Sequence, residues 1–178
     1  MNFSLRTFEH RTPVIGQGVY IDPTATVIGD VSLGQDSSVW PMAVIRGDVN
    51  AIHIGTSCSI QDGAILHVTH DGPFTPGGKA LILGNNITIG HQAVLHGCTI
   101  EDTCLIGMGA LILDGAHLQS QVLLAAGSVV PPGKTLKSGY LYLGNPAQAI
   151  RALTAEELAH LHYSAQHYVK LKNRYLIT

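Results

Sequence analysis

The sequence predicts an all-β solenoid, a parallel β-helix of hexapeptide repeats, followed by one C-terminal α-helix. An aliphatic residue recurs every six positions along most of the chain, a period that fits neither an α-helix nor a hairpin sheet. The composition agrees, because charged residues are only 12% and 20 of the 178 residues are glycine, which suits short strands joined by tight corners. From about residue 150 the apolar spacing becomes helical.

The repeat predicts which residues point inward. A small or β-branched residue stands four positions after many of the aliphatic ones, as at Ala43, Ala64 and Ala93. We expect stacked coils, each hydrogen-bonded to the next, around an aliphatic core. A sandwich or barrel of short strands is the alternative, but its strands recur at about 8–12 residues with alternating polarity, which this chain lacks. The repeated aliphatic residues are Ile15, Ile21, Val27, Leu33, Val39, Ile45, Ile54, Ile60, Leu66, Leu83, Ile89, Leu95, Ile100, Ile106, Ile112, Leu118, Leu124, Val130 and Leu136.

We expect residues 1–150 to form the β-helix and residues 151–178 to form the helix, within a single domain. At the helix start, Thr154 is the predicted N-cap, Glu157 closes a capping box, and Leu153 can contact Leu158. The segment 68–80 breaks the repeat with glycine and proline, which predicts a long loop protruding from a corner. The stripe predicted to face the β-helix is Leu158, Leu161, Ala165, Tyr168, Val169, Lys172 and Leu176.

Charge and cysteine content narrow the function classes. A net charge of −2 and a pI near 6.5 favour neither nucleic acid nor an anionic membrane surface as a partner. Apolar segments are too short for a transmembrane helix, and the first residues lack the pattern of a secretory signal. Cys58, Cys98 and Cys104 suit neither a disulfide framework nor a thiolate zinc site. We therefore expect buried, unreactive thiols and a cytoplasmic location.

Three of the ten histidines have placements that the repeat constrains. His67 directly follows Leu66 and His96 directly follows Leu95, so both occupy the same repeat position. Neighbouring coils lie about 4.8 Å apart, close enough for both imidazoles to bind one metal ion. His91 falls one place off this position and on an earlier face, so it would join such a site only from a neighbouring subunit. Three imidazoles with a fourth position open are typical of a catalytic zinc site; chance clustering is the alternative.

Two polar elements interrupt aliphatic strands, where charge is costly unless it is paired. They are R-G-D at residues 46–48 and Q-D at residues 61–62. Arg46 and Asp62 would be a sensible pair across a subunit interface. Asp48 and Gln61 would then be free to hydrogen-bond near a water at the metal. The alternative is that both elements only form turns at corners of the coil, because Gly-Asp and Asp-Gly are good turn dipeptides.

Together these elements resemble the gamma-class carbonic anhydrase family over essentially the whole chain. The resemblance is carried by R-G-D at 46–48, Q-D-G at 61–63, Leu66-His67, and the stretch from Gly90-His91 to His96-Gly97. Within that family, V-W-P at 39–41, L-H-V-T-H at 66–70 and G-Y-L-Y at 139–142 are most similar to the bacterial YrdA-like subfamily.

The resemblance implies a left-handed β-helix and a homotrimer with a metal site between subunits. His67 and His96 of one subunit and His91 of its neighbour would hold zinc, with iron(II) or cobalt as alternative ions. The family arrangement would place Gln61 and Asp48 beside the bound water. It also implies that Arg46 and Asp62 pair across the interface and that Tyr168 reaches the site from the helix.

The activity implied by the resemblance is the reversible hydration of carbon dioxide to bicarbonate. A metal ion lowers the pKa of its bound water from about 15.7 to about 7, and the resulting hydroxide attacks carbon dioxide. The proton then leaves through a group whose pKa is near neutral. This chain departs from the most active members, which carry acids where it has Val49 and His70. His70 is a candidate proton shuttle or simply a surface loop residue.

Two other functions compete with this interpretation. One is a metal-binding homologue with little or no turnover, which the absence of an acid at Val49 favours. The other is a coenzyme A-dependent acyltransferase, the commonest chemistry among hexapeptide-repeat enzymes, which typically uses one histidine as a base and needs no metal. The paired histidines and the R-G-D element favour the carbonic anhydrase over the acyltransferase.

Overall fold

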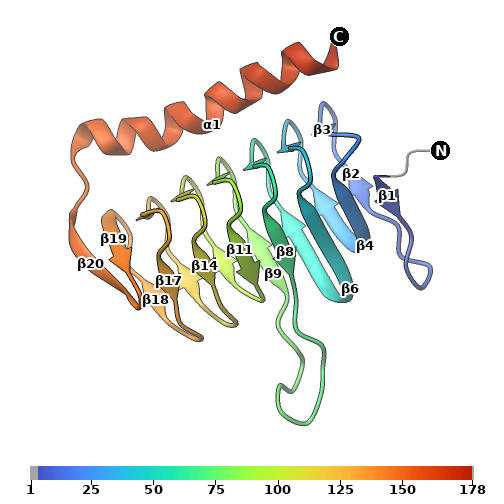
Figure 1. Cartoon of the computed structure of the whole chain (residues 1–178), viewed down its shortest axis with the longest axis horizontal. Helices are drawn as coiled ribbons and strands as arrows, with labels where there is room; N and C mark the ends of the chain where they lie inside the picture. The colour runs from blue at the N-terminus through green and yellow to red at the C-terminus, as the bar shows by residue number, and fades with distance from the viewer. Residues whose placement is uncertain (1–3, 178) are drawn as a thin grey trace.

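A computed structural model describes residues 4–177 and shows a parallel β-helix with one long helix along its side (Figure 1). The β-helix is left-handed, as the family resemblance implies, and it has about eight turns. The strands form two hydrogen-bonded sheets, and the larger sheet bends through two long strands, so the coils have three faces.

The strand bounds follow the three faces. The first face contains β3 (Tyr20–Ile21), β5 (Ser38–Val39), β7 (Ser59–Ile60), β10 (Thr88–Ile89), β13 (Leu105–Ile106), β16 (Leu123–Leu124), β19 (Tyr140–Gly144) and β20 (Ala147–Ala152). The second contains β1 (Leu5–Arg6), β8 (Ile65–His67), β11 (Val94–His96), β14 (Leu111–Ile112) and β17 (Val129–Val130). The third contains β2 (Val14–Ile15), β9 (Leu81–Leu83), β12 (Thr99–Ile100), β15 (His117–Leu118) and β18 (Thr135–Leu136). The long strands β4 (Thr26–Leu33) and β6 (Val44–Ile54) run through the corner between the second and third faces.

The core consists of aliphatic columns in strict register, which confirms the six-residue repeat. On the second face, Ile45, Leu66, Leu95, Ile112 and Val130 lie one above the other and are fully buried. Burial of each such side chain away from water contributes about 1.5–3 kcal/mol to the free energy of folding. Matching columns on the other faces are Val39, Ile60, Ile89, Ile106 and Leu124, and Ile54, Leu83, Ile100, Leu118 and Leu136.

The helix α1 (Ala155–Leu176) begins as predicted. Thr154 is its N-cap, and the capping box with Glu157 is formed in both directions. The helix contacts β3, β5, β7 and β10 and so covers the first face. Leu161, Ala165 and Lys172 are buried beneath it.

The predicted helical stripe is wrong at its end, because Leu176 is 48% exposed. Lys172 lies on the buried stripe because hydrogen bonds satisfy its ammonium group. Its ammonium Nζ donates to the Gly18 carbonyl at 2.5 Å and to the Asp36 carboxylate at 2.7 Å. These bonds fasten the last turns of the helix to the first coils.

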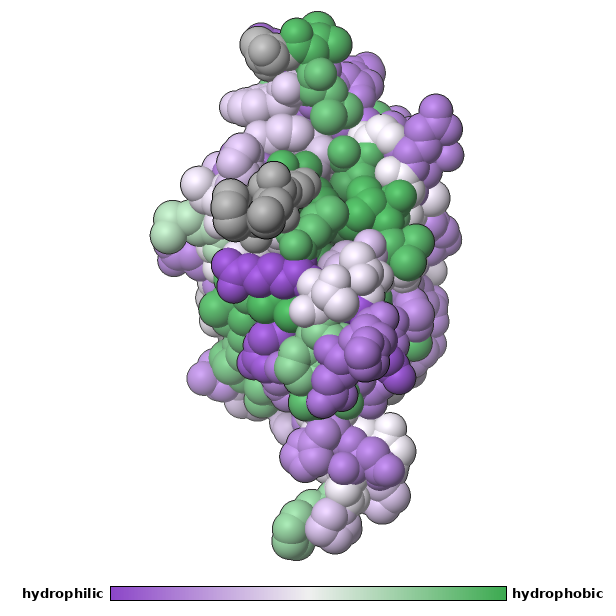
Figure 2. All heavy atoms as spheres, turned by 90° about the vertical axis from the view of Figure 1, so that its right-hand side faces the viewer, coloured by the Kyte–Doolittle hydropathy of each residue, from purple (hydrophilic) through white to green (hydrophobic). Residues whose placement is uncertain are grey.

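Two segments depart from the regular coil. The loop between β8 and β9 occupies residues 68–80, as predicted, and Figures 1 and 2 show it protruding from the body with a mostly hydrophilic surface. At the other end of the β-helix, β20 pairs antiparallel with β19. This hairpin was not predicted from the sequence, because the repeat contains no signal for a reversal of direction. It occupies the edge that the last parallel strand would otherwise expose.

The three cysteines are free and buried, as predicted. Burial raises the pKa of each thiol to about 12, so the thiols stay protonated and unreactive at neutral pH. Within residues 4–177, no helix combines the length and the apolar character needed to cross a membrane.

Candidate metal centre

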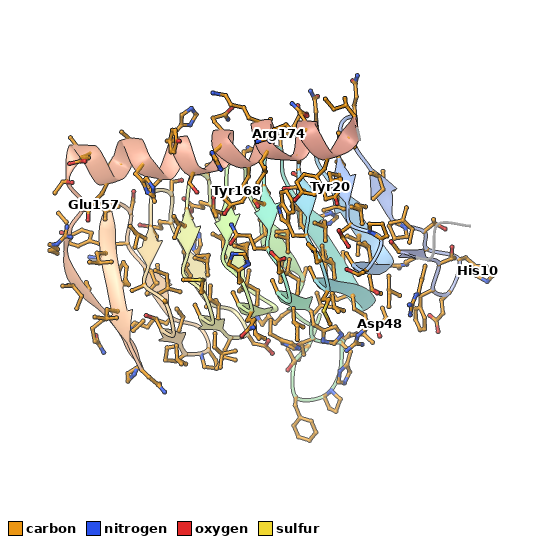
Figure 3. All side chains as sticks on the ribbon, turned by 45° about the horizontal axis from the view of Figure 1, so that its top comes forward. His10, Tyr20, Asp48, Glu157, Tyr168 and Arg174 are labelled. Atoms are coloured by element: carbon orange, nitrogen blue, oxygen red, sulfur yellow. The ribbon has the colours of Figure 1, made fainter. Side chains whose placement is uncertain are left out.

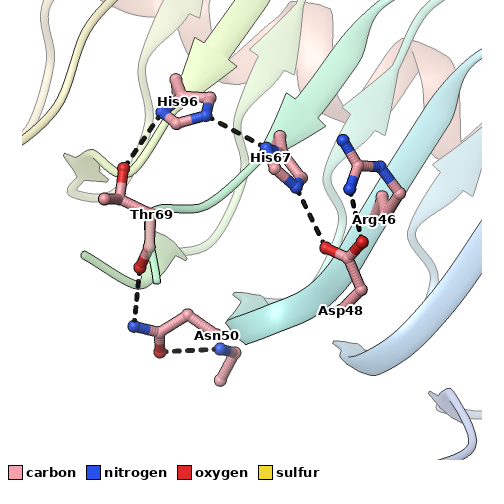
Figure 4. Close-up of polar contacts among 7 residues, drawn as sticks. Arg46, Asp48, Asn50, His67, Thr69 and His96 are labelled. Atoms are coloured by element: carbon pink, nitrogen blue, oxygen red, sulfur yellow. Dashed lines mark hydrogen bonds and ion pairs between the residues drawn. The ribbon is translucent and has the colours of Figure 1, made fainter. Parts of the chain in front are cut away.

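The register of the coils brings two of the predicted ligand histidines together. His67 on β8 pairs in register with His96 on β11, and Arg46 precedes them in the same column. His67 Nδ1 lies 3.0 Å from His96 Nε2, and both rings are partly buried (Figure 4). The prediction that equivalent repeat positions stack on neighbouring coils is therefore confirmed for His67 and His96.

A carboxylate holds the outer nitrogen of each of these rings. His67 Nε2 is 3.0 Å from Asp48 Oδ1, and His96 Nδ1 is 2.5 Å from Asp114 Oδ1. Thr69 Oγ1 donates to the other oxygen of Asp114 at 2.6 Å. Because a carboxylate only accepts hydrogen bonds, the outer nitrogen of each histidine carries the hydrogen. When both rings are neutral, as metal ligands are, the two facing nitrogens then both present lone pairs.

This arrangement fits a metal ion. Two imidazole nitrogens that face each other at 3.0 Å either share a proton in an N–H···N hydrogen bond or give both lone pairs to a metal ion. A carboxylate behind each imidazole is the usual support of a metal-binding histidine. Burial, more than the nearby Asp48, decides the protonation of His67 and lowers its pKa below the ordinary value, which favours the neutral ring that a metal requires.

The carboxylates themselves stay ionised. Partial burial favours the neutral acid at Asp48, but hydrogen bonds from His67 and Arg46 outweigh it and lower its pKa. Likewise, hydrogen bonds from His96 and Thr69 outweigh burial and lower the pKa of Asp114. Both groups can therefore accept hydrogen bonds throughout the neutral range.

The third predicted ligand lies apart from this pair. His91 stands at the corner after β10, where its Nδ1 is 2.9 Å from Asp62 Oδ2. About half of each of these side chains is exposed. In the part of the chain that the structure describes, no group of three His, Cys, Asp or Glu side chains is close enough to hold a metal ion.

Gln61 and Tyr168 lie around the same cavity as His91. A cavity of about 290 Å³ is lined by these three residues and by apolar side chains that include Met108 and Leu105. Gln61 is 4% exposed at the end of β7. Tyr168 reaches down from α1, and Figure 3 shows it under the helix while Asp48 lies at the opposite edge of the β-helix.

The predicted site residues thus form two separate groups within one chain. Arg46, Asp48, His67 and His96 lie on the second face, and Gln61, Asp62, His91 and Tyr168 lie at the corner beside the first face. We call them the two-histidine group and the His91 group. Arg46 forms its ion pair with Asp48 in the same chain, and Asp62 pairs with His91. A contact between Arg46 and Asp62 would require a second subunit and stays a prediction.

His70 belongs to neither group. It is exposed at the base of the 68–80 loop and lines a different cavity, together with Asp48 and Val49. No hydrogen bond in the described residues 4–177 joins it directly to His67 or His96. Its role as a proton shuttle stays a prediction.

Sequence reasoning missed Asp114 and Thr69. Asp114 lies eighteen residues after His96, which is one full coil of three hexapeptides, so the spacing held a usable signal. Thr69 lies two residues after His67, at the start of the loop, and the loop path brings its hydroxyl to Asp114. No periodic argument reaches a residue placed by a loop.

Asp114 offers a direct test of the carboxylate support. In Asp114→Ala the His96 ring loses the acceptor that orients it, and we expect the affinity for zinc to fall by about 10–100-fold. Titration against a chelator of known affinity measures the change. The matched control is Glu101→Ala, which removes the carboxylate partner of His117 on the third face. Equal affinities for the Asp114 variant and the unmodified protein would show that Asp114 does not support a ligand.

Comparison with known proteins gives relatives over nearly the whole chain. Protein YrdA of Escherichia coli K12 is 51% identical over 176 residues, covering 99% of this chain and 96% of that protein. The mitochondrial gamma carbonic anhydrase 2 of Arabidopsis thaliana is 42% identical over 163 residues, covering 90% of this chain but only 58% of the plant protein. The family pattern described as "Bacterial transferase hexapeptide (six repeats)" matches residues 12–47.

Solved structures agree on the fold. A hexapeptide transferase family protein from Anaplasma phagocytophilum superimposes with a TM-score of 0.89 at 36% identity, over 98% of this chain and 99% of that one. A Bacillus cereus structure described as a putative acetyltransferase gives 0.90 at 38% identity, over 98% of both chains. The relatives YrdA and the plant gamma carbonic anhydrase confirm the resemblance to that family. The two solved structures confirm the predicted fold.

Proposed function

We propose that this chain, which belongs to the gamma-carbonic-anhydrase-like family of hexapeptide-repeat proteins, is a metal-dependent enzyme for the reversible hydration of carbon dioxide. The observation that carries the proposal is the pair His67 and His96, whose facing nitrogens are 3.0 Å apart and whose outer nitrogens are each held by a carboxylate. A carboxylate behind each of two adjacent imidazoles is the usual support of metal-binding histidines. The relation to the plant gamma carbonic anhydrases supports the reaction class.

The metal would be held by His67 and His96 of one subunit and by His91 of its neighbour. Zinc is the expected ion, with iron(II) or cobalt as alternatives. When bound, such an ion supplies a Lewis acid that makes water nucleophilic at neutral pH. The separation of the two-histidine group from the His91 group supports this shared arrangement, because neither group alone provides three ligands.

A homotrimer would bring the two groups together. The outer side of the second face carries a column of aliphatic residues in register, beside the two-histidine group. Surface apolar columns of this kind are typical of subunit interfaces. The column consists of Val44, Ile65, Val94, Leu111 and Val129.

The remaining residues would act on substrate and proton. Asp48 Oδ1 accepts the His67 Nε2 hydrogen and so fixes the ring orientation. The buried amide of Gln61 and the Tyr168 hydroxyl would orient carbon dioxide and water within the apolar cavity of the His91 group. Arg46 would exchange its partner Asp48 for the neighbour's Asp62, which would free one Asp48 oxygen to accept a hydrogen bond from water.

A cytoplasmic location is proposed from the cysteines. Cys58, Cys98 and Cys104 are buried free thiols. Such thiols suit a reducing compartment, where disulfides are rare.

Metal content and activity of the purified protein test the proposal together. We expect about one zinc, iron or cobalt ion per chain and carbon dioxide hydration above the buffer rate in a stopped-flow assay with a pH indicator. Protein without a bound transition metal would contradict the proposal and favour acyl transfer, which the description of the Bacillus cereus structure also suggests. Metal-replete protein at the buffer rate would indicate a metal-binding homologue without turnover.

The shared site makes a separate prediction for His91. In His91→Ala we expect lower metal content and a weaker trimer, because a metal that bridges subunits stabilises the assembly in which it binds. Elemental analysis and light scattering after size exclusion measure both quantities. His117→Ala is the control, since His117 also pairs with a carboxylate but lies on the third face. Unchanged metal content would exclude His91 as a ligand.

A further inference from the structure

The 68–80 loop carries an aromatic side chain at its tip. Phe74 is 98% exposed, the highest value among the large apolar side chains of residues 4–177. Residues 72–78 around it include no charged side chain. A phenyl ring left in water forgoes the stabilisation that burial would supply. Because no charge would have to be desolvated with it, this tip is suited to an apolar cavity on a partner.

The loop holds Phe74 out on a well-ordered arm. At its base, Thr69 and Lys79 exchange both backbone hydrogen bonds, at 3.0 and 2.9 Å. Near the tip, Gly72 and Thr75 exchange theirs at 3.3 and 3.1 Å and enclose a two-residue turn that contains Phe74. An arm with its own ladder of hydrogen bonds loses little conformational freedom on binding, which favours affinity.

The cavity of the His91 group has the size and the walls that a phenyl ring needs. Its volume is about 290 Å³, and an apolar cavity of about 150 Å³ is enough to bind benzene. Leu105 and Met108 are among its walls. The hydroxyls of Thr88 and Ser164 in its lining are 3.0 Å apart and hydrogen-bond each other, so a ring beside them leaves neither unsatisfied. A ring takes roughly half of the space and leaves the rest for substrate.

The proposed shared metal brings the arm of one subunit to the cavity of the next. His67 directly precedes the loop, and the neighbour's His91 lines the neighbour's cavity. Two nitrogens bound to one ion at about 2.1 Å lie within about 4 Å of each other. The neighbour's cavity therefore begins beside the base of the arm. From residue 70 to Phe74 an extended chain spans about 16 Å, which is enough to reach into it.

The direction of the arm agrees with this partner. The loop leaves the corner between the second and third faces and points away from α1 of its own chain (Figure 1). It therefore points away from the cavity of its own chain, which lies beneath α1. Subunits of a three-fold ring are turned by about 120° relative to one another. With the neighbour's His91 corner at the base of the loop, this turn places the neighbour's first face and helix alongside the arm.

We propose that the 68–80 loop is an intersubunit clasp, in which Phe74 of one subunit enters the neighbour's cavity between α1 and the first face. This inference rests on the proposed function, because the shared metal sets how the subunits meet. The ring contacts the neighbour's Met108 and forms the outer wall of the cavity. The clasp closes that cavity to bulk water and extends the interface beyond the aliphatic column of the second face.

Crosslinking of introduced thiols tests the contact without metal or activity. In the double variant Phe74→Cys, Met108→Cys we expect a short bismaleimide to join different chains, giving covalent dimers and trimers on a denaturing gel. The native cysteines do not interfere, because they are buried and their pKa values are about 12. The control is Phe74→Cys, Thr135→Cys, since Thr135 is exposed on the third face and should give no such product. A product of the Met108 pair that runs as a single chain would overturn the clasp.

Phe74→Ala tests the clasp in the otherwise unmodified protein. The chain has three methionines, so selective methyl labelling gives a spectrum in which Met108 and Met42 are readily assigned. Loss of the ring should shift the Met108 signal and leave that of Met42 unchanged. The concentration at which half of the trimer has dissociated should rise by at least about tenfold, as for loss of a buried aromatic anchor. Phe8→Ala, at a partly exposed phenylalanine of the first coil, should leave both quantities unchanged.

The outcomes separate the clasp from the proposed function. A metal-bound trimer in which Phe74→Ala moves neither the Met108 signal nor the dissociation midpoint would overturn the clasp and leave the shared metal site standing. An unmodified protein that is monomeric when loaded with zinc would overturn the shared site, and the clasp with it.

Discussion

Replacing His96 by alanine is expected to remove the metal and the carbon dioxide hydration together. The variant loses one of the two converging nitrogens. Of the three proposed ligands it would keep only His67 and the His91 of a neighbouring subunit, too few to hold the ion firmly. We expect less than a tenth of the normal zinc content and a rate lower by about a thousand-fold, since no other group in the site acidifies water comparably. Elemental analysis and stopped-flow hydration on the same sample measure both effects.

The control for this variant is His117→Ala on the third face, which should keep full metal content. Thermal unfolding of metal-free samples shows whether the substitution weakens the fold as well as metal binding. The His96 side chain points outward beside the buried Leu95, so the fold should be little affected. Similar unfolding temperatures for variant and unmodified apoprotein are expected. A His96→Ala protein that retains zinc would contradict the ligand assignment.

The largest expected effect on stability comes from Asp36→Ala. Lys172 is essentially fully buried, with a side chain 1% exposed, and its ammonium depends on Asp36 and the Gly18 carbonyl. Removing Asp36 leaves a buried charge with one partner, which we expect to lower the free energy of unfolding by about 3 kcal/mol. Urea unfolding followed by circular dichroism measures the loss.

A second substitution separates the charge from the packing. Lys172→Met removes the buried charge and keeps the apolar stem, so adding it to Asp36→Ala should recover most of the lost stability. A double variant as unstable as Asp36→Ala alone would show that Asp36 stabilises the corner and not the lysine.

The same pair has a defined pH dependence. The hydrogen bond from Lys172, against a smaller opposing effect of burial, lowers the pKa of Asp36 below its ordinary value. Because the folded pKa is lower than the unfolded one, the stabilisation is complete above about pH 4 and is lost as pH falls through the folded value. The stability difference between the unmodified protein and Asp36→Asn should therefore shrink below pH 4. A difference independent of pH would contradict the ion pair.

Much of the candidate site was predictable because it lies within the regular coils. Leu66 and Leu95 belong to one buried column, and the next residue of each coil must then point outward at the same height. The pairing of His67 with His96 follows directly. The displacement of His91 to another corner follows from its one-residue offset in the repeat.

Other parts were not predictable because loops and chain ends place them. The path of the 68–80 loop brings Thr69 to Asp114. The segment 8–11 brings Glu9 to the cavity that His70 also lines. The antiparallel strand β20 had no signal in the repeat. Leu176 continued the helical spacing but extends past the surface that the first face offers, so it stays exposed.

The sequence by itself determined the β-helix, its core columns and the meeting of His67 with His96. A six-residue period leaves one way to bury an aliphatic side chain in every repeat, and burial then sets the register of the coils. The tertiary structure alone decided which carboxylate supports each histidine and that the site residues form two separate groups. It also decided that Glu9 and His70 share a cavity. Those contacts join side chains from different coils and loops, whose relative positions depend on the closed three-dimensional path of the chain.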